Sequence, residues 1–222
     1  MADSAMNQSP LVAVDVVIFT IAGKQLCALL VEARGGPFAG RWAFPGGLVP
    51  VGEAPEATAT RELLAQTGIS DVYLEQLRTF GDPHRDPHAH VVSVAYFALL
   101  PSKGEAQSAN PKYGRPQWFP VRALPQLAYD HNLIAADALK RLQAKLEYTN
   151  IVYSLMPGEF TLGELQEVYE IILGRRLDRR NFRKKILALG LLRSLRRQRR
   201  GPHRPALLYA FAHRQPMMIE ML

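Results

Sequence analysis

The stretch 47–69 carries residues whose types and spacing bear on whether a metal ion can be held there. Glu62 lies in a predicted helix, and the positions three and four residues after it share its helix face. Carboxylates at all three positions would form the oxygen cluster that a hard cation such as Mg²⁺ needs. This chain has Ala65, which lacks a ligand atom, and Gln66, whose side-chain oxygen is uncharged. The residues therefore predict a site that holds Mg²⁺ weakly or not at all.

The spacing of the whole stretch resembles the Nudix box, the loop-helix-loop of hydrolases that cut nucleoside diphosphates linked to another group. That pattern is Gly, five residues, Glu, seven residues, Arg-Glu-aliphatic, one residue, Glu-Glu, one residue, Gly-aliphatic. The chain matches it at Gly47, Glu53, Arg61-Glu62-Leu63 and Gly68-Ile69, and departs from it at Ala65-Gln66. The resemblance implies an α/β fold, the Nudix α/β/α sandwich, with the box helix over about Pro55 to Thr67.

Two outcomes of the departure from the box remain open. In the first, the box folds and shapes a pocket but catalyses nothing, so that we expect no catalytic residue, no metal ligand and no required cofactor. In the second, the chain is an active Mg²⁺-dependent ADP-ribose pyrophosphatase with an accessory basic domain, and its metal is held by Glu53, Glu56 and Glu62. We favour the first because a neutral amide replaces a carboxylate poorly as a ligand for Mg²⁺.

Length and composition set the frame around this stretch. The chain has 222 residues, which allows one large or two modest domains, and 48% of them are hydrophobic. Its single cysteine, Cys27, excludes an internal disulfide and a cysteine-based zinc site, so we predict a cytoplasmic protein. No apolar run approaches the ~18 residues of a membrane span. A predicted helix ends the first part of the chain, because apolar residues recur there with a helical period: Leu133, Ala136, Leu139, Leu142 and Leu146.

Charge divides the chain into two parts. Residues 173–205 hold thirteen Lys and Arg against one acid, Asp178, which gives +12. The remainder then has fourteen Lys and Arg against nineteen Asp and Glu, which gives −5. This asymmetry predicts that only the C-terminal part meets a polyanion. We place the domain boundary near Glu147, with domains over 1–147 and 148–222.

The C-terminal part shows the order of a winged helix-turn-helix, which makes it the second and smaller domain. A capping box formed by Thr161 and Glu164 opens one helix, and Asp178 caps the next, which ends at Gly190. A short apolar helix over 148–156 is predicted before them. After them, two apolar segments flank a basic tip and read as a hairpin.

The helix after Asp178 predicts contact with duplex DNA. If Phe182 faces the core, Ile186 and Leu189 lie beside it, and basic and amide side chains cover the opposite face. Such side chains reach base edges in a major groove, and a basic hairpin suits phosphates or a minor groove. The DNA-binding candidates are Arg179, Arg180, Asn181, Arg183 and Lys184 on the helix and Arg197, Arg199, Arg200, His203 and Arg204 in the hairpin. The alternative is a solvated basic face, or a patch for RNA or membrane.

The two parts together resemble the Nudix-related transcriptional regulators of NAD metabolism. The resemblance covers nearly the whole chain and includes the altered box, the loop 79–83, Arg85-Asp86 and the strand 91–96. It implies a repressor of NAD synthesis or salvage genes whose Nudix domain binds ADP-ribose or a related nucleotide, which releases the protein from DNA. The effector-binding candidates are Arg41, Phe44, Gly47, Arg61, Glu62, Asp82 and Arg85. For Arg61, pairing with Glu53 inside the box is equally expected.

The partners predicted are double-stranded DNA, the nucleotide effector and a second copy of this chain. A twofold homodimer would read a pseudo-palindromic operator whose half-sites lie ~34 Å apart. A third reading also remains open, in which the chain binds nucleic acid generally and its Nudix half only mediates dimerisation.

Overall fold

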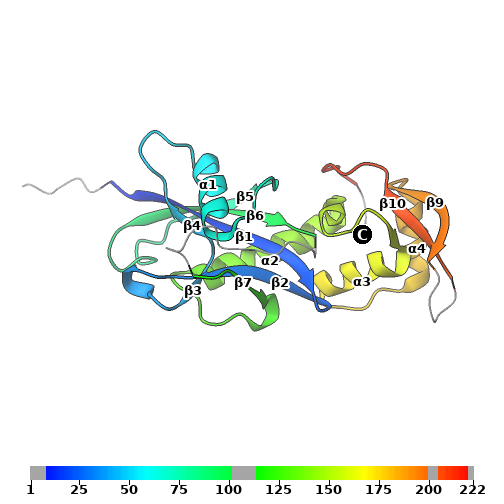
Figure 1. The fold of residues 1–222 in the computed structure, drawn as a ribbon, viewed down its shortest axis with the longest axis horizontal. Helices are drawn as coiled ribbons and strands as arrows, with labels where there is room; N and C mark the ends of the chain where they lie inside the picture. Colours follow the sequence, from blue (N-terminus) through cyan, green and yellow to red (C-terminus); the bar gives the residue numbers. More distant parts are fainter. Residues whose placement is uncertain (1–8, 102–113, 200–204, 220–222) are drawn as a thin grey trace, which may run out of the picture.

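A computed structural model describes residues 9–101, 114–199 and 205–219. The first part contains β1 (Leu11–Ala22), β2 (Gln25–Glu32), β3 (Trp42–Ala43), β4 (Gly46–Leu48), α1 (Pro55–Thr67), β5 (Glu75–Phe80), β6 (Val91–Leu99), β7 (Gln117–Pro120) and α2 (His131–Tyr148). The second contains β8 (Phe160–Thr161), α3 (Leu162–Leu173), α4 (Arg179–Ala188), β9 (Leu192–Arg199) and β10 (Ala206–Phe211). Figure 1 shows the two parts side by side along the long axis of the molecule.

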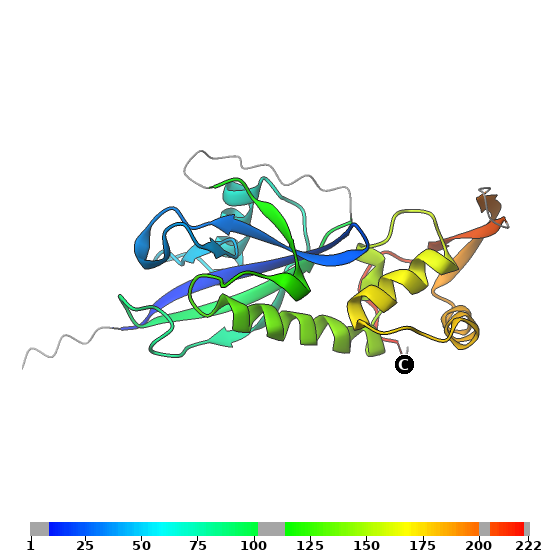
Figure 2. The ribbon, with the colours of Figure 1, turned by 90° about the horizontal axis from the view of Figure 1, so that it is seen from below.

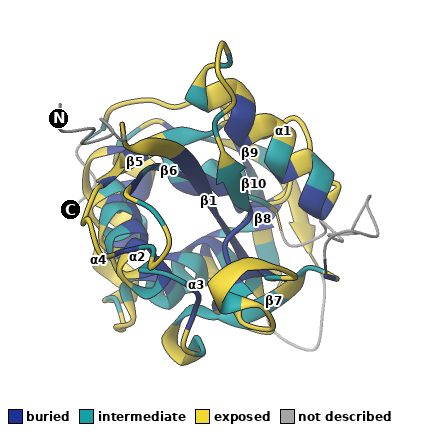
Figure 3. Cartoon of the chain, turned by 90° about the vertical axis from the view of Figure 1, so that its left-hand side faces the viewer, coloured by how far each residue is buried: buried dark blue, intermediate teal, exposed yellow. Residues whose placement is uncertain are grey.

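The sheet of the first part is built around β1, which lies at its centre (Figure 3). The strand order is β3-β2-β1-β6-β5, with β4 paired to β1 and β7 paired to β2. β1 is antiparallel to β2 and β4 but parallel to β6. Because successive side chains of a strand point to opposite faces, Val14 and Val16 join one core cluster and Val17 and Phe19 join another. Both faces of the sheet are therefore buried.

One helix covers each face of the sheet (Figure 2). α1 packs Ala59 and Leu63 into the cluster that contains Val14 and Val16, and α2 packs Ile134 and Leu142 into the cluster on the other face. The expected α/β/α sandwich is confirmed. The predicted apolar stripe of α2 is wrong in its first half. Leu133 and Ala136 are exposed, whereas Ile134, Ala135 and Ala138 are buried.

The second part is a winged helix-turn-helix, as predicted. Its three-stranded sheet has the order β8-β10-β9 and packs beside α3, which in turn contacts α4. The capping box at the start of α3 forms, because the Glu164 N–H donates to Thr161 Oγ1 at 3.2 Å and the Thr161 N–H donates to Glu164 Oε2 at 2.7 Å. Asp178 caps α4 by accepting from the Asn181 N–H at 2.8 Å.

One hydrophobic core runs through both parts. Leu146 of α2, Val152, and Leu165 and Tyr169 of α3 belong to the same cluster as the sheet residues that face α2. The predicted apolar helix over 148–156 is wrong, because α2 continues to Tyr148 and only a short 3-10 turn, Ile151–Ser154, follows. A direct polar contact also joins the parts, since the Gln143 side-chain amide donates to the Ile172 carbonyl at 2.9 Å. Within the described ranges, no helix is long and apolar enough to cross a membrane.

Candidate functional site

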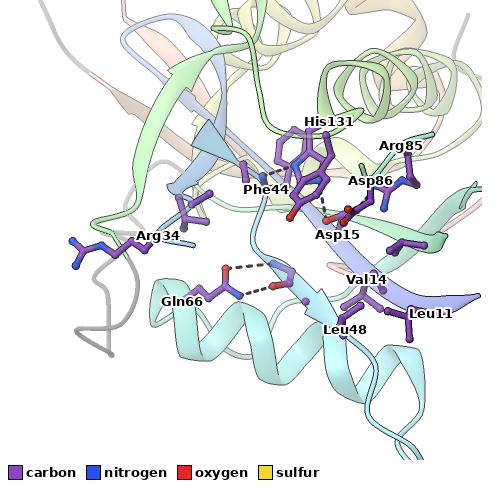
Figure 4. A pocket seen from close by; sticks show the side chains of 18 of the residues that line it. Leu11, Val14, Asp15, Arg34, Phe44, Leu48, Gln66, Arg85, Asp86 and His131 are labelled. Atoms are coloured by element: carbon purple, nitrogen blue, oxygen red, sulfur yellow. Dashed lines mark hydrogen bonds and ion pairs between the residues drawn. The ribbon is translucent and has the colours of Figure 1, made fainter. Parts of the chain in front are cut away.

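A pocket of about 320 Å³ opens beside the first half of β1. Figure 4 shows its lining, to which Asp15 of β1, Phe44, Gln66 of α1, Arg85 of the β5–β6 loop and His131 of α2 all contribute. These residues come from five separate segments of the chain. The sheet and its two covering helices are what bring them together.

The floor of the pocket is a buried network of charged and polar side chains. The Arg85 guanidinium is 3% exposed and lies 3.2 Å from Asp15 Oδ2 and 2.6 Å from Asp130 Oδ1. Asp15 Oδ2 also accepts from the Ser93 hydroxyl at 2.6 Å, and Asp15 Oδ1 lies 3.2 Å from His131 Nε2. Burial alone would raise the pKa of the Asp15 carboxyl, but His131, Ser93 and Arg85 outweigh it and lower that pKa from 3.8 to about 2.

The ring of His131 is fixed by contacts on both of its nitrogens. Its Nδ1 accepts the Phe44 backbone N–H at 3.0 Å, so the ring proton belongs on Nε2, which faces Asp15. In this tautomer the imidazole is neutral. The two carboxylates of Asp15 and Asp130 then face a single guanidinium, that of Arg85, and the floor keeps one net negative charge.

Aromatic rings form one wall of the pocket. Phe44 stacks on His131 with ring centroids 5.5 Å apart, and Tyr129 lies 5.4 Å from the same histidine ring. Tyr129 has a positive φ of 51°, which is rare for a bulky residue and marks a backbone held by its surroundings. A wall of this kind suits a nucleobase or the apolar face of a sugar.

The acidic residues of the Nudix box are paired with an arginine. Arg61 Nε and Nη2 lie 3.0 and 2.9 Å from the two carboxylate oxygens of Glu53, and Arg61 Nη1 lies 2.5 Å from Glu62 Oε1. The Arg61 guanidinium, through these hydrogen bonds, lowers the pKa of the Glu53 carboxyl. The expected pairing of Arg61 with Glu53 inside the box therefore forms.

Gln66 connects the box helix to the strand in front of it. Its Nε2 donates to the Gly46 carbonyl at 2.6 Å and to Glu62 Oε2 at 2.8 Å, and its Oε1 accepts the Gly46 N–H at 3.4 Å. The residue is 4% exposed. Of Glu53, Glu56 and Glu62, the alternative Mg²⁺ ligands, Glu53 and Glu62 are paired with Arg61. Among the described residues, no three acidic, histidine or cysteine side chains are grouped so that they could hold a metal ion.

The predicted effector-binding residues separate into two groups. Phe44, Gly47 and Arg85 line the pocket. The other four do not: Arg41 is exposed beside the Phe38 ring, Arg61 and Glu62 pair within the box, and Asp82 shapes the β5–β6 loop. The Asp82 carbonyl accepts the Arg85 N–H at 3.0 Å, which helps to hold that arginine in place.

A second candidate surface lies on α4 and the β9–β10 hairpin, at the end of the molecule far from α1 (Figures 1 and 2). Phe182 and Ile186 are buried, as the helical period predicted. Of the candidates on α4, Arg183 is half-buried and the other four are exposed: Arg179, Arg180, Asn181 and Lys184. The helix therefore presents a basic and amide face to solvent.

Two of the candidate arginines in the hairpin are paired with acids of the same domain. Arg197 bonds to Glu159, and Arg199 bonds to Glu164. Both arginines are exposed, so these pairs are surface contacts that a phosphate could replace. The remaining hairpin candidates, Arg200, His203 and Arg204, lie outside the described residues.

Comparison with known families matches both parts of the chain. The NUDIX domain family matches residues 9–142, and the NrtR DNA-binding winged helix domain matches residues 152–211. A curated relative, the ADPR responsive transcriptional repressor NtrR of Acinetobacter baylyi, is 39% identical over 208 residues, which are 92% of this chain and 83% of the relative. The chain belongs to the NrtR family.

Solved structures of NrtR carry both kinds of ligand. Shewanella oneidensis NrtR complexed with a 27mer DNA matches with a TM-score of 0.78 and 34% identity, over 90% of this chain and 93% of that one. The NUDIX domain of the same NrtR complexed with ADP ribose matches with a TM-score of 0.56 and 35% identity, over 64% and 94%. An enzyme is also similar: the ADP-ribose pyrophosphatase of Methanocaldococcus jannaschii is 34% identical over 131 residues, 59% of this chain and 74% of the enzyme.

Sequence reasoning missed several residues that line the pocket of this NrtR family member, among them Asp15, Tyr129 and His131. Asp15 is the lone charge in the apolar run Leu11–Thr20, and a buried strand rarely carries an acid without a partner. This lone acid could therefore have marked Asp15 as a candidate site residue. Tyr129 and His131 flank the predicted start of α2, where nothing in the sequence separates pocket residues from capping residues.

Proposed function

We propose that this NrtR family protein is a transcriptional repressor that binds duplex DNA through α4 and the β9–β10 hairpin. ADP-ribose, bound in the pocket of the Nudix domain, releases it. The observation that carries the proposal is a single core that joins a nucleotide-sized pocket to a winged helix with an exposed basic face. An effector derived from NAD points to genes of NAD synthesis or salvage as the regulated set.

The pocket suits a ligand that combines an aromatic base, a ribose and a diphosphate. Phe44 and Tyr129 provide apolar surface, and Asp15 provides a carboxylate at the floor. Because the floor is net negative, it favours donors such as ribose hydroxyls or a base amino group over phosphate. We place the diphosphate toward Arg34, which Figure 4 shows on the opposite side of the pocket from Arg85.

The same pocket supports binding without hydrolysis. Gln66 occupies the place of a box carboxylate, and Arg61 pairs with both Glu53 and Glu62. The similarity to an ADP-ribose pyrophosphatase favours the alternative, an active enzyme. Incubation of the purified chain with ADP-ribose and Mg²⁺, with AMP release followed, separates the two. Binding without release supports the repressor, and sustained Mg²⁺-dependent turnover supports the enzyme.

The DNA-binding half is tested by charge reversal on α4. Arg180→Glu and Lys184→Glu should each weaken a gel shift on the DNA upstream of the chain's own gene by roughly 5- to 150-fold, because base contacts of this kind contribute about 1–3 kcal/mol. Lys140→Glu makes the same change at an exposed position of α2 and serves as the control. If the α4 variants bind like the control, α4 is not the reading helix.

The effector half is tested by the same gel shift in the presence of ADP-ribose. Added ADP-ribose should reduce the shifted fraction, and calorimetry should show heat for ADP-ribose on the free protein. A ligand that binds both forms equally would shift nothing, so binding heat without release would contradict the regulatory role. Absence of heat and of release would favour the third reading, in which the Nudix half only mediates dimerisation.

We further propose that the protein acts as a twofold homodimer on a pseudo-palindromic operator. The two winged helix domains of the dimer would read half-sites ~34 Å apart, so a modest rotation of one domain against the other would spoil the fit to DNA. Bound nucleotide could release the DNA through such a rotation. Light scattering of the protein with and without operator DNA checks this, and a monomer under both conditions would contradict it.

A further inference from the structure

The amide of Gln66 sits where two oxygens converge. The Gly46 carbonyl oxygen and Glu62 Oε2 lie 2.6 and 2.8 Å from the same nitrogen, Nε2. A carbonyl and a carboxylate that point at one position are the donors a hard cation takes, yet the group between them is an NH₂. Gln66 is 4% exposed and lines the pocket, as does Gly46.

We propose that the Gln66 amide takes the place of a bound divalent cation, so that the pocket wall is held in shape without a metal. This inference deepens the proposed function, because it makes nucleotide binding independent of Mg²⁺. The amide supplies two N–H donors to the two oxygens and carries no net charge. The amide therefore bridges the Gly46 carbonyl oxygen and Glu62 Oε2, whereas a carboxylate at position 66 would repel these oxygens.

The contact holds more than one element in position. Gly46 is the first residue of β4 and pairs with Asp15 on β1, whose carboxylate forms the pocket floor. Gly46 also has no room for a side chain, because a Cβ there would lie 2.1 Å from the Val14 carbonyl oxygen. Through Gly46, the Gln66 amide therefore ties α1 to the strand that carries Asp15.

Replacing this amide with a carboxylate should restore a need for the cation. In Gln66→Glu an oxygen would stand in place of Nε2, within about 3 Å of two other oxygens, and nothing would separate them. We expect the melting temperature to fall on the order of 5 °C in EDTA and to recover by at least half in millimolar Mg²⁺ or Mn²⁺. The wild-type melting temperature should be the same in both buffers.

Two matched variants make the result specific. Gln66→Met keeps the approximate length but has no donor, so its melting temperature should fall in both buffers without recovery. Gln76→Glu makes the same chemical change at an exposed position of β5 and should respond to neither buffer. All melting-temperature measurements use the full chain without nucleotide, so their outcome is separate from that of the DNA and effector tests.

Three results would overturn the inference. They are a Gln66→Glu variant as stable as wild type in EDTA, a destabilised variant that Mg²⁺ and Mn²⁺ do not restore, and a wild-type protein that these ions stabilise equally. Calorimetry adds a direct check: ADP-ribose should bind wild type with affinities that agree within about twofold in EDTA and in Mg²⁺.

Discussion

Replacing Asp15 with Asn should destabilise the protein in a manner that depends on pH. The neighbours of Asp15 lower the pKa of its carboxyl from 3.8 to about 2. Because the folded-state pKa is the lower one, the ionised carboxyl stabilises the fold above the unfolded-state pKa. That stabilisation is lost as the pH falls through the folded-state pKa. At 1.36 kcal/mol per pKa unit, the difference corresponds to about 2 kcal/mol at pH 7.

The loss in Asp15→Asn should therefore be at least about 2 kcal/mol at pH 7, and up to ~5 kcal/mol if the remaining Arg85 contact is strained as well. Arg85 keeps Asp130 as a partner, which favours the lower figure. The same linkage predicts that about half of the pKa-derived difference is gone by pH 3. Urea unfolding of both proteins across this range measures it.

A control and a contrary outcome define the test. Asp71→Asn makes the same change at an exposed position and should cost within about 0.5 kcal/mol. Asp15→Asn as stable as wild type at pH 7 would refute the reasoning. So would a deficit that stays constant down to pH 3, since it would show that charge at the pocket floor contributes nothing.

Two further predictions concern the winged helix. Phe182→Ala should destabilise it by about 3–5 kcal/mol, because Phe182 is buried and packs edge-on against Tyr169 at 5.3 Å; thermal unfolding measures the loss, and Phe182→Leu should recover part of it. Gly174→Ala should cost about 1 kcal/mol, because Gly174 has a φ of +69° and an added Cβ would lie 1.7 Å from the end of the Arg122 side chain. An unchanged urea midpoint for Gly174→Ala would show that this turn relaxes freely.

The parts of the fold that local rules decide were predictable from the sequence. α1 has the predicted bounds because Pro55 suits the first turn of a helix and Gly68 adopts the left-handed conformation that ends one. The capping box of α3 and the Asp178 cap of α4 follow from similarly short spacings. Each of these features depends on residues within a few positions of one another.

The first half of the α2 stripe was a misread period. At about 100° per residue Leu133 lies about 180° from Leu142, whereas Ile134 lies about 80° from it and is buried on the same side. Features that depend on tertiary packing, by contrast, were not predictable. The pocket floor could not be predicted, because Arg85 lies seventy positions from Asp15 and forty-five from Asp130 in the sequence. The sequence marks each of these residues as charged but does not state which of them will be buried together.

α2 is the element through which an event in the pocket can reach the winged helix. Its first residue, His131, faces Asp15 in the pocket floor, and Gln143, three turns further on, holds the Ile172 carbonyl of α3. A helix transmits displacement along its axis because its hydrogen bonds keep its length fixed. A ligand that moves the His131 end must therefore either move α3 or break the Gln143 contact. In the homodimer that we propose, a displacement of α3 would change the spacing of the two DNA-binding domains, which is the quantity that a pseudo-palindromic operator reads.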